Sequence, residues 1–296
     1  MLAASSCSAP PDEPVRPHRK VLVNQVTAAQ ALATKDRFGI AFLQPTAPWG
    51  TQWVSNWTGS RHFTGVDPRD TWFDADHGSA SYKVSDGVLS ISGAVPRMYV
   101  HDPERKRQWR DVEVTVYFRR RSDDSVPYAG MVAVARSNHL SDIGPRVSCD
   151  TRGYGARVRY DGNTDFEKET AHPLNEAHGQ QDLWRDGLPA NTWIGFKFLV
   201  YDKSDGVHLE TWIDQADGKD RASWTMANEL IDDGHVFGKD PCAEGIDPQM
   251  ALTRSSQREG SESGRPNLSV YFRSDGVHKH GLQYKWASIR EIVPRP

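Results

Sequence analysis

The chain has 296 residues and a formal net charge of −3, so it is long enough to bury a sizeable core and has no basic excess of the kind that nucleic-acid binding needs. No run of about 18 apolar residues is present, which excludes a transmembrane segment of the helical kind. Ten Trp, nine Tyr and ten Phe, together with 24 Gly and 18 Pro, favour an all-β protein with many loops.

The N-terminal stretch is rich in Pro and polar side chains, and we expect residues 1–36 to form a disordered tail. Within it, Leu-Ala-Ala-Ser-Ser before Cys7 is similar to the end of a bacterial lipoprotein signal, with Ala4 where Leu is usual. This resemblance implies an export or anchor segment in a secreted or cell-surface lipoprotein, with a lipid on Cys7. The alternative is the tail of a cytosolic protein.

From Phe38 onward, short runs of alternating apolar and polar residues are separated by turn residues, which predicts about ten to fourteen strands. We expect residues 37–296 to form one domain, an all-β, two-sheet antiparallel β-sandwich of the jelly-roll type with few short helices. The expected strands lie within residues 81–93, 111–120, 129–139, 155–170, 191–214, 267–276 and 282–292. The expected helices are short, at residues 26–34 and 227–231.

Two of the three cysteines, Cys149 and Cys242, lie in turn-rich segments. Since an exported protein can keep a disulfide, we expect these two residues to be bonded; the alternative is a pair of free thiols. No Cys-x-x-Cys or His/Cys cluster indicates zinc.

A hairpin is predicted over residues 155–170, and its turn decides which side chains share a face. A two-residue turn would leave neither face apolar. A three-residue loop that ends at Gly162 places Ala156 opposite Phe166 and leaves one clean apolar face, so this register is expected. Its charged face then carries Arg157, Arg159, Asp165, Glu167 and Glu169.

A second, longer hairpin is predicted over residues 193–214. Its apolar residues alternate toward the core, and the other face carries Trp193, Lys197, Tyr201, His208, Glu210, Trp212 and Asp214. We expect the polar faces of both hairpins to belong to one concave sheet and to line one groove. The alternative is an ordinary solvated sheet face.

The segment after this hairpin, residues 214–220, is rich in Asp and Gly. A structural calcium ion held by Asp214, Asp217 and Asp220 is one interpretation, and a simple hairpin turn is the favoured one. No other cofactor is expected.

The succession of strands with a charged, aromatic face resembles the concanavalin A-like superfamily of lectins, glucanases and polysaccharide lyases, over roughly residues 38–293. Asp165-Phe-Glu-Lys-Glu169 is similar to the Glu-x-Asp-x-Glu strand of family 16-type glucanases, with the first two residue types exchanged. The strand signatures of alginate lyases are absent. The resemblance implies a polysaccharide partner.

Three functions remain open for such a face. The first is a lyase that cleaves an acidic polysaccharide by β-elimination, in which a cation neutralises the substrate carboxylate while a base and an acid move protons. The candidate cations are Arg157, Arg159 and Lys197, the candidate bases His172, His139 and His208, and the candidate acid Tyr201. The second is a retaining hydrolase that uses two carboxyls of Asp165, Glu167 and Glu169.

The third function is a carbohydrate-binding, lectin-like module, in which indole rings stack on sugars. Its candidate residues are Trp193, Trp212 and Trp184, with His139, His208 and Glu210 as polar contacts. We expect the lyase, because the cations Arg157, Arg159 and Lys197, in one groove with the indole rings, would favour an anionic chain.

Overall fold

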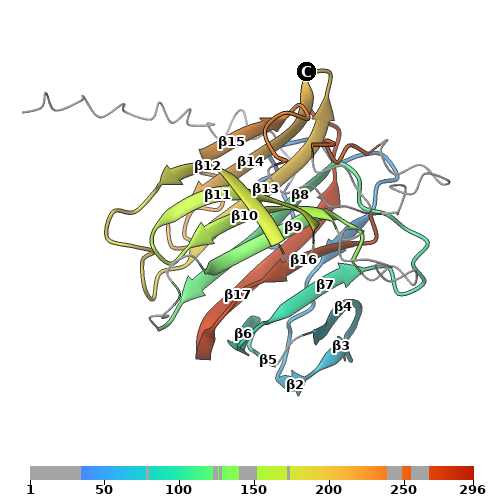
Figure 1. Ribbon diagram of the computed structural model, residues 1–296. Coiled ribbons are helices and arrows are strands. Elements are labelled where there is room, and N and C mark those ends of the chain that lie inside the picture. The colour runs from blue at the N-terminus through green and yellow to red at the C-terminus, as the bar shows by residue number, and fades with distance from the viewer. Residues whose placement is uncertain are drawn as a thin grey trace, which may run out of the picture.

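The computed structural model of the protein describes residues 35–77, 80–122, 126, 129–139, 152–171, 174–238, 249–254 and 267–296. Every regular element in these ranges is a β-strand, and the strands pair in two antiparallel sheets (Figure 1).

The nine-stranded sheet runs in the order β15-β14-β13-β8-β17-β6-β5-β2, and β1 pairs with β17 outside this path. Its strands are β1 (Gln52–Val54), β2 (Arg61–Phe63), β5 (Ala80–Ser85), β6 (Val88–Gly93), β8 (Val112–Arg120), β13 (Ile194–Lys203), β14 (Gly206–Asp214), β15 (Thr225–Asp232) and β17 (Val277–Glu291).

The eight-stranded sheet runs in the order β12-β11-β10-β9-β16-β7-β4-β3. Its strands are β3 (Gly65–Asp67), β4 (Asp70–His77), β7 (Arg97–His101), β9 (Gly130–Ser137), β10 (Gly153–Arg159), β11 (Asn163–Ala171), β12 (Leu174–Asp182) and β16 (Ser269–Arg273).

The two sheets lie face to face as the layers of a sandwich (Figure 1). Between them, the ring of Phe166 on β11 lies 6.2 Å from the ring of Phe198 on β13, and both side chains are fully buried. The predicted fold class, an all-β two-sheet sandwich, is therefore confirmed.

A second, smaller apolar cluster covers part of the outer face of the nine-stranded sheet. Ile40 and Leu43 of the segment before β1 pack there against Leu199, Tyr201 and Trp212. This segment therefore shields side chains of β13 and β14 that would otherwise face solvent.

The register of the β10–β11 hairpin is the predicted one. Ala156 lies opposite Phe166 and Arg157 opposite Asp165, and the connecting loop ends at Gly162 with a φ of 89°. Ala156, Val158 and Phe166 are all fully buried, as expected for the apolar face of this hairpin.

Two expectations from the sequence are wrong. Residues 227–231 are part of strand β15 and not of a helix, because pairing with β14 outweighs the weak helical tendency of so short a segment. The two polar hairpin faces do not share a sheet, since β10–β11 and β13–β14 belong to different sheets. Both apolar faces point into one core, so the two polar faces point away from each other.

Several expectations fall outside the described residues: the helix at residues 26–34, the lipid anchor at Cys7, the disulfide between Cys149 and Cys242, and the base His172. They stay predictions.

The sandwich core makes a direct prediction. Phe166→Ala should lower the free energy of unfolding by about 3–5 kcal/mol, because it removes a fully buried ring and leaves a cavity between the sheets. Chemical denaturation measures this. Leu174→Ala on β12 is the control, since that side chain is 62% exposed and its loss should cost less than about 0.5 kcal/mol. Equal losses in the two variants would contradict the assigned faces.

Candidate functional site

The outer face of the eight-stranded sheet carries a layer of polar and aromatic side chains. On β11 the alternation that turns Phe166 and Lys168 inward turns the three acidic residues outward. On each of three other strands of this sheet, two side chains that stand two positions apart point to the same outer face. The outer face therefore holds Arg97 and Tyr99 of β7, Tyr271 and Arg273 of β16, Arg157 and Arg159 of β10, and Asp165, Glu167 and Glu169 of β11.

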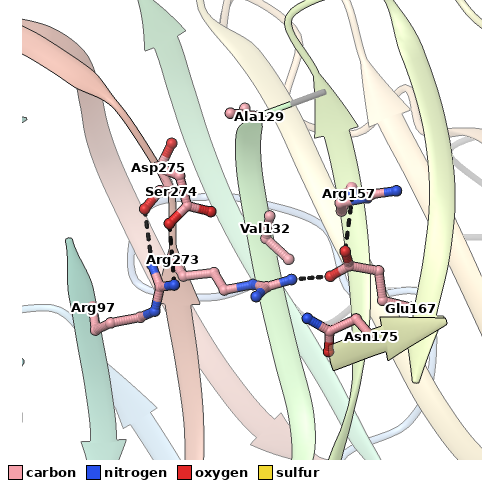
Figure 2. Close-up of a pocket in the computed structure, with 10 residues that line it drawn as sticks. Arg97, Ala129, Val132, Arg157, Glu167, Asn175, Arg273, Ser274 and Asp275 are labelled. Carbon is pink, nitrogen blue, oxygen red and sulfur yellow. Dashed lines mark hydrogen bonds and ion pairs between the residues drawn. The ribbon is translucent and has the colours of Figure 1, made fainter. Parts of the chain in front are cut away.

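A cavity of about 240 Å³ opens in this face. Six strands and two connecting segments contribute to it, so it depends on the whole sheet and not on one hairpin (Figure 2). It is lined by Arg97, Ala129, Gly130, Val132, Arg157, Glu167, Asn175, Arg273, Ser274 and Asp275.

Ion pairs hold the arginines of the cavity in place. Arg157 donates through Nε and Nη2 to the two carboxylate oxygens of Asp165, at 2.6 Å each, and its Nη1 lies 2.9 Å from Glu167. Arg273 reaches the other oxygen of Glu167 from the far side of the cavity, and Arg97 pairs with Asp275 at 3.1 Å (Figure 2). Such paired, partly buried guanidiniums are fixed donors.

The charge of Arg273 is secured by its neighbours. Burial acts to lower the pKa of this guanidinium. Glu167 has the largest opposing effect, followed by Tyr271 and Glu169, and together they raise the pKa above its ordinary value. Arg273 is therefore a permanent cation in the lining of the cavity.

Two tyrosines and a histidine form a compact group beside Arg273. The ring centroids of Tyr99 and Tyr271 are 4.7 Å apart, and His139 lies 5.2 Å from Tyr271 and 6.0 Å from Tyr99. His139 Nε2 lies 3.3 Å from a carboxylate oxygen of Glu169. Because Tyr271 and Arg273 stand two positions apart on one strand, this group adjoins the cavity.

Both phenols of this group stay protonated at neutral pH. Burial, followed by the carboxylate of Glu169, raises the pKa of Tyr271 well above its ordinary value. Burial also raises the pKa of Tyr99. The pair can therefore donate hydrogen bonds or a proton, and His139 is the neighbouring group suited to accept one.

Part of this site was not expected from the sequence. Arg97, Tyr99, Tyr271, Arg273 and Asn175 come from strands far apart in the chain. The signal that could have found four of them is the repeated pattern in "RMY" (97–99) and "YFR" (271–273), in which an arginine and a tyrosine stand two positions apart. Of the predicted residues, the face holds Arg157, Arg159, Asp165, Glu167, Glu169 and His139.

The cation expected in the groove, Lys197, lies on the other sheet and is fully buried. Its Nζ lies 2.7 Å from Glu113 and 2.8 Å from the hydroxyl of Thr115. Burial lowers the pKa of Lys197 against the opposing effect of Glu113, and the same carboxylate also pairs with Arg290. Lys197 is thus an internal charge and is not available to a polymer.

The remaining predicted residues of the long hairpin also face away from the cavity. Glu210 accepts hydrogen bonds from the hydroxyl of Tyr201 and, at 2.7 Å, from the indole of Trp212. His208 lies 2.8 Å from Asp205 and stacks on Tyr201. The polar atoms of these side chains bond mainly to one another and to Asp205, and the segment at Ile40–Leu43 packs over the hairpin.

Two further tryptophans expected to stack on sugars are only half-buried. The indole of Trp184 donates a hydrogen bond to Gln215 at 3.3 Å. Cations approach the ring of Trp193, with the guanidinium carbon of Arg119 at 4.4 Å and Nζ of Lys285 at 4.2 Å. Neither residue lines the cavity.

The calcium candidates serve the turn instead. Asp214 accepts from Tyr117 and from the backbone of Ala216, Asp217 accepts from the backbone of Trp193, and Asp220 caps its own turn. Among the described residues no three His, Cys, Asp or Glu side chains gather as a metal site, and these three do not form one. A helix able to cross a membrane is likewise not found in the part of the chain that the structure covers.

No protein-family model matches this chain, and no curated protein sequence matches it. Solved structures of similar fold include the VIP36 exoplasmic/lumenal domain in its Ca²⁺/Man3GlcNAc-bound form, which is 9% identical with a TM-score of 0.45, over 82% of this chain and 92% of that one. Another is winged bean acidic lectin complexed with methyl-α-D-galactose, at 12% identity and a TM-score of 0.44, over 80% and 99%. A third is the legume lectin-like domain from Entamoeba histolytica, at 11% and 0.43, over 79% and 97%.

Two of these three structures are, by their names, a lectin and a legume lectin-like domain, and the likeness is one of fold alone. At such low identities and with TM-scores below 0.5, no ligand and no residue role passes from them to this chain.

The burial of Lys197 predicts a stability effect. Lys197→Met should lower the free energy of unfolding by about 1–3 kcal/mol, because it removes one of the two cations that pair with the buried carboxylate of Glu113 and leaves only Arg290. Lys203→Met, at the exposed end of the same strand, is the control and should change stability little. If thermal or chemical denaturation shows Lys197→Met to be as stable as the unmodified protein, Lys197 is not an internal ion pair.

Proposed function

We propose that this protein binds carbohydrate, in a lectin-like manner, through the cavity in the outer face of the eight-stranded sheet. The observation that carries the proposal is the lining of this cavity, in which fixed hydrogen-bond donors and acceptors surround a space of about 240 Å³. A lectin-like module is one of the three functions that the sequence leaves open. The tryptophans expected for it lie in or near the β13–β14 hairpin, whereas the cavity is lined by residues of the eight-stranded sheet.

The mixture of groups in the cavity suits sugar hydroxyls. A hydroxyl donates one hydrogen bond and accepts others, so it is satisfied best where both kinds of partner are present. Arg97, Arg157 and Arg273 only donate, Glu167 and Asp275 accept, and the amide of Asn175 does both. Because the ion pairs hold these groups before a ligand arrives, little side-chain entropy is lost on binding.

Cleavage by a retaining hydrolase is less well supported. That reaction needs two free carboxyl groups that flank the bond. Asp165 is held by Arg157 and Arg159, and Glu167 by Arg157 and Arg273. Carboxylates engaged in this way serve to fix the arginines.

Cleavage by β-elimination is the second candidate, favoured by the group of Tyr99, His139 and Tyr271 beside Arg273. Arg273 would neutralise a uronate carboxylate, and His139 would take the proton from the adjacent carbon. The bond from the β-carbon to the glycosidic oxygen would then break as a double bond forms, and Tyr271 would protonate the leaving oxygen.

Asn175 provides the cleanest test of binding. Asn175→Ala should weaken the binding of a matching polysaccharide by about tenfold, as for loss of one or two hydrogen bonds to the ligand, with the thermal midpoint nearly unchanged. Titration calorimetry against a panel of neutral and acidic polysaccharides measures this. Lys83→Met, an exposed cation on the nine-stranded sheet, is the control and should bind normally.

The same panel separates binding from elimination. Binding without any change in the polymer supports the lectin-like function, and ultraviolet absorbance from an unsaturated product would support the lyase. Tyr271→Phe should abolish that absorbance but leave binding intact. If no polysaccharide of the panel is bound, or if Asn175→Ala binds as well as the unmodified protein, the proposal fails.

A further inference from the structure

On the outer face of the nine-stranded sheet, cations and indole rings alternate in a row. The order is Arg119, Trp193, Lys285, Trp286, Arg221, and we call these five residues the cation–indole row. The guanidinium carbon of Arg119 lies 4.4 Å from the ring centre of Trp193, and Nζ of Lys285 lies 4.2 Å from Trp193 and 3.7 Å from Trp286. The guanidinium of Arg221 completes the row at 3.9 Å from Trp286.

A β-bulge in β17 builds the centre of the row. The register shifts between Lys285 and Ser288, and Trp286 has a φ of 56°, a left-handed conformation that is costly for a bulky residue. The bulge brings the consecutive side chains of Lys285 and Trp286 to the outer face, while Ala287 remains in the core. Backbone strain of this kind is retained where surrounding contacts enforce it.

The cations of the row are not in ion pairs among the described residues. Arg119 donates to the amide oxygen of Gln283, at 3.1 and 2.7 Å, and Arg221 donates to backbone carbonyls. Within the same part of the chain Lys285 makes only its contacts with aromatic rings. The arginines of the cavity differ, since each of them is paired with a carboxylate.

Burial and neighbouring cations shift the pKa values of the row in the same direction. Burial, together with Arg221 and Arg119 and against the opposing effect of Asp217, lowers the pKa of Lys285 to about 8. Burial and the nearby Arg121 likewise lower the pKa of Arg119. One oxygen of Asp217 is already used by the backbone amide of Trp193.

We propose that the cation–indole row is a second binding site, which holds the carboxylate or sulfate groups of an acidic polysaccharide. Stacking on the indoles fixes three cations in a line, and an anionic chain with charges at intervals can contact them in succession. The choice of a polysaccharide rests on the proposed function. The row and the cavity face opposite sides of the sandwich, so each can be removed without touching the other.

Lys285→Met tests the site, because Met keeps the contact with the rings and removes the charge. Binding of polygalacturonate, measured by calorimetry at low and at physiological salt, should weaken about tenfold, as for loss of one charge-assisted contact. Arg119→Gln, at the edge of the row, should weaken it in the same direction and is the second variant if Lys285→Met does not fold. Lys219→Met is the matched control, since its side chain is 83% exposed on the neighbouring loop, and it should bind normally.

The outcomes separate this site from the cavity. Weaker binding of polygalacturonate in Lys285→Met, with binding of a neutral glucan unchanged, supports the row. The cavity variant Asn175→Ala should instead bind the neutral glucan about tenfold more weakly. Undiminished polygalacturonate binding in both row variants overturns the proposal and leaves the cavity untouched. An equal loss in Lys219→Met would show nonspecific charge attraction and would also overturn it. A single-stranded DNA bound more tightly than polygalacturonate would overturn the choice of polysaccharide.

Discussion

The apolar faces of the two sheets meet in one core, and this contact determines where every outward side chain of the strands can lie. Phe166 and Phe198 face each other across it, one from each sheet. Because a strand has only two faces, the residues that alternate with these rings must point to opposite sides of the sandwich. The charged face of β10–β11 and the aromatic face of β13–β14 are thereby separated by the full thickness of the core. The sandwich has two outer surfaces of different chemistry.

The two outer surfaces differ in whether their cations are paired with carboxylates. At the cavity, each arginine is neutralised by a carboxylate, and the resulting network fixes donors and acceptors around an open space. On the other sheet, Lys197 is buried and paired with Glu113, which also accepts a hydrogen bond from the backbone of Leu43. Lys285 of the same sheet lies between two indole rings, without an ion pair in the described part of the chain. The first arrangement suits hydroxyl groups and the last suits anions.

The sequence predicted strand register correctly where the register depends only on the residues of one hairpin. The register that places Ala156 opposite Phe166 follows from the need for one apolar face, and the structure has it. The partners of that hairpin could not be predicted, because β9 and β16 become neighbours through long connections and not through a turn. For this reason Arg157 and Glu167 were found in advance, whereas Arg273 and Tyr271 were not. Lys197 was misplaced because alternation marks it as outward-facing but says nothing of the segment that covers it.

We propose that saccharide binds in the cavity between Arg97 and Arg157. A crystal structure with an oligosaccharide derived from the polymer that the protein binds most tightly tests it directly. We expect a sugar ring inside the cavity, with its hydroxyls within hydrogen-bond distance of Asn175, Glu167 and Arg273. A sugar found instead over β13 and β14, or an empty cavity in a complex that binds in solution, would contradict it.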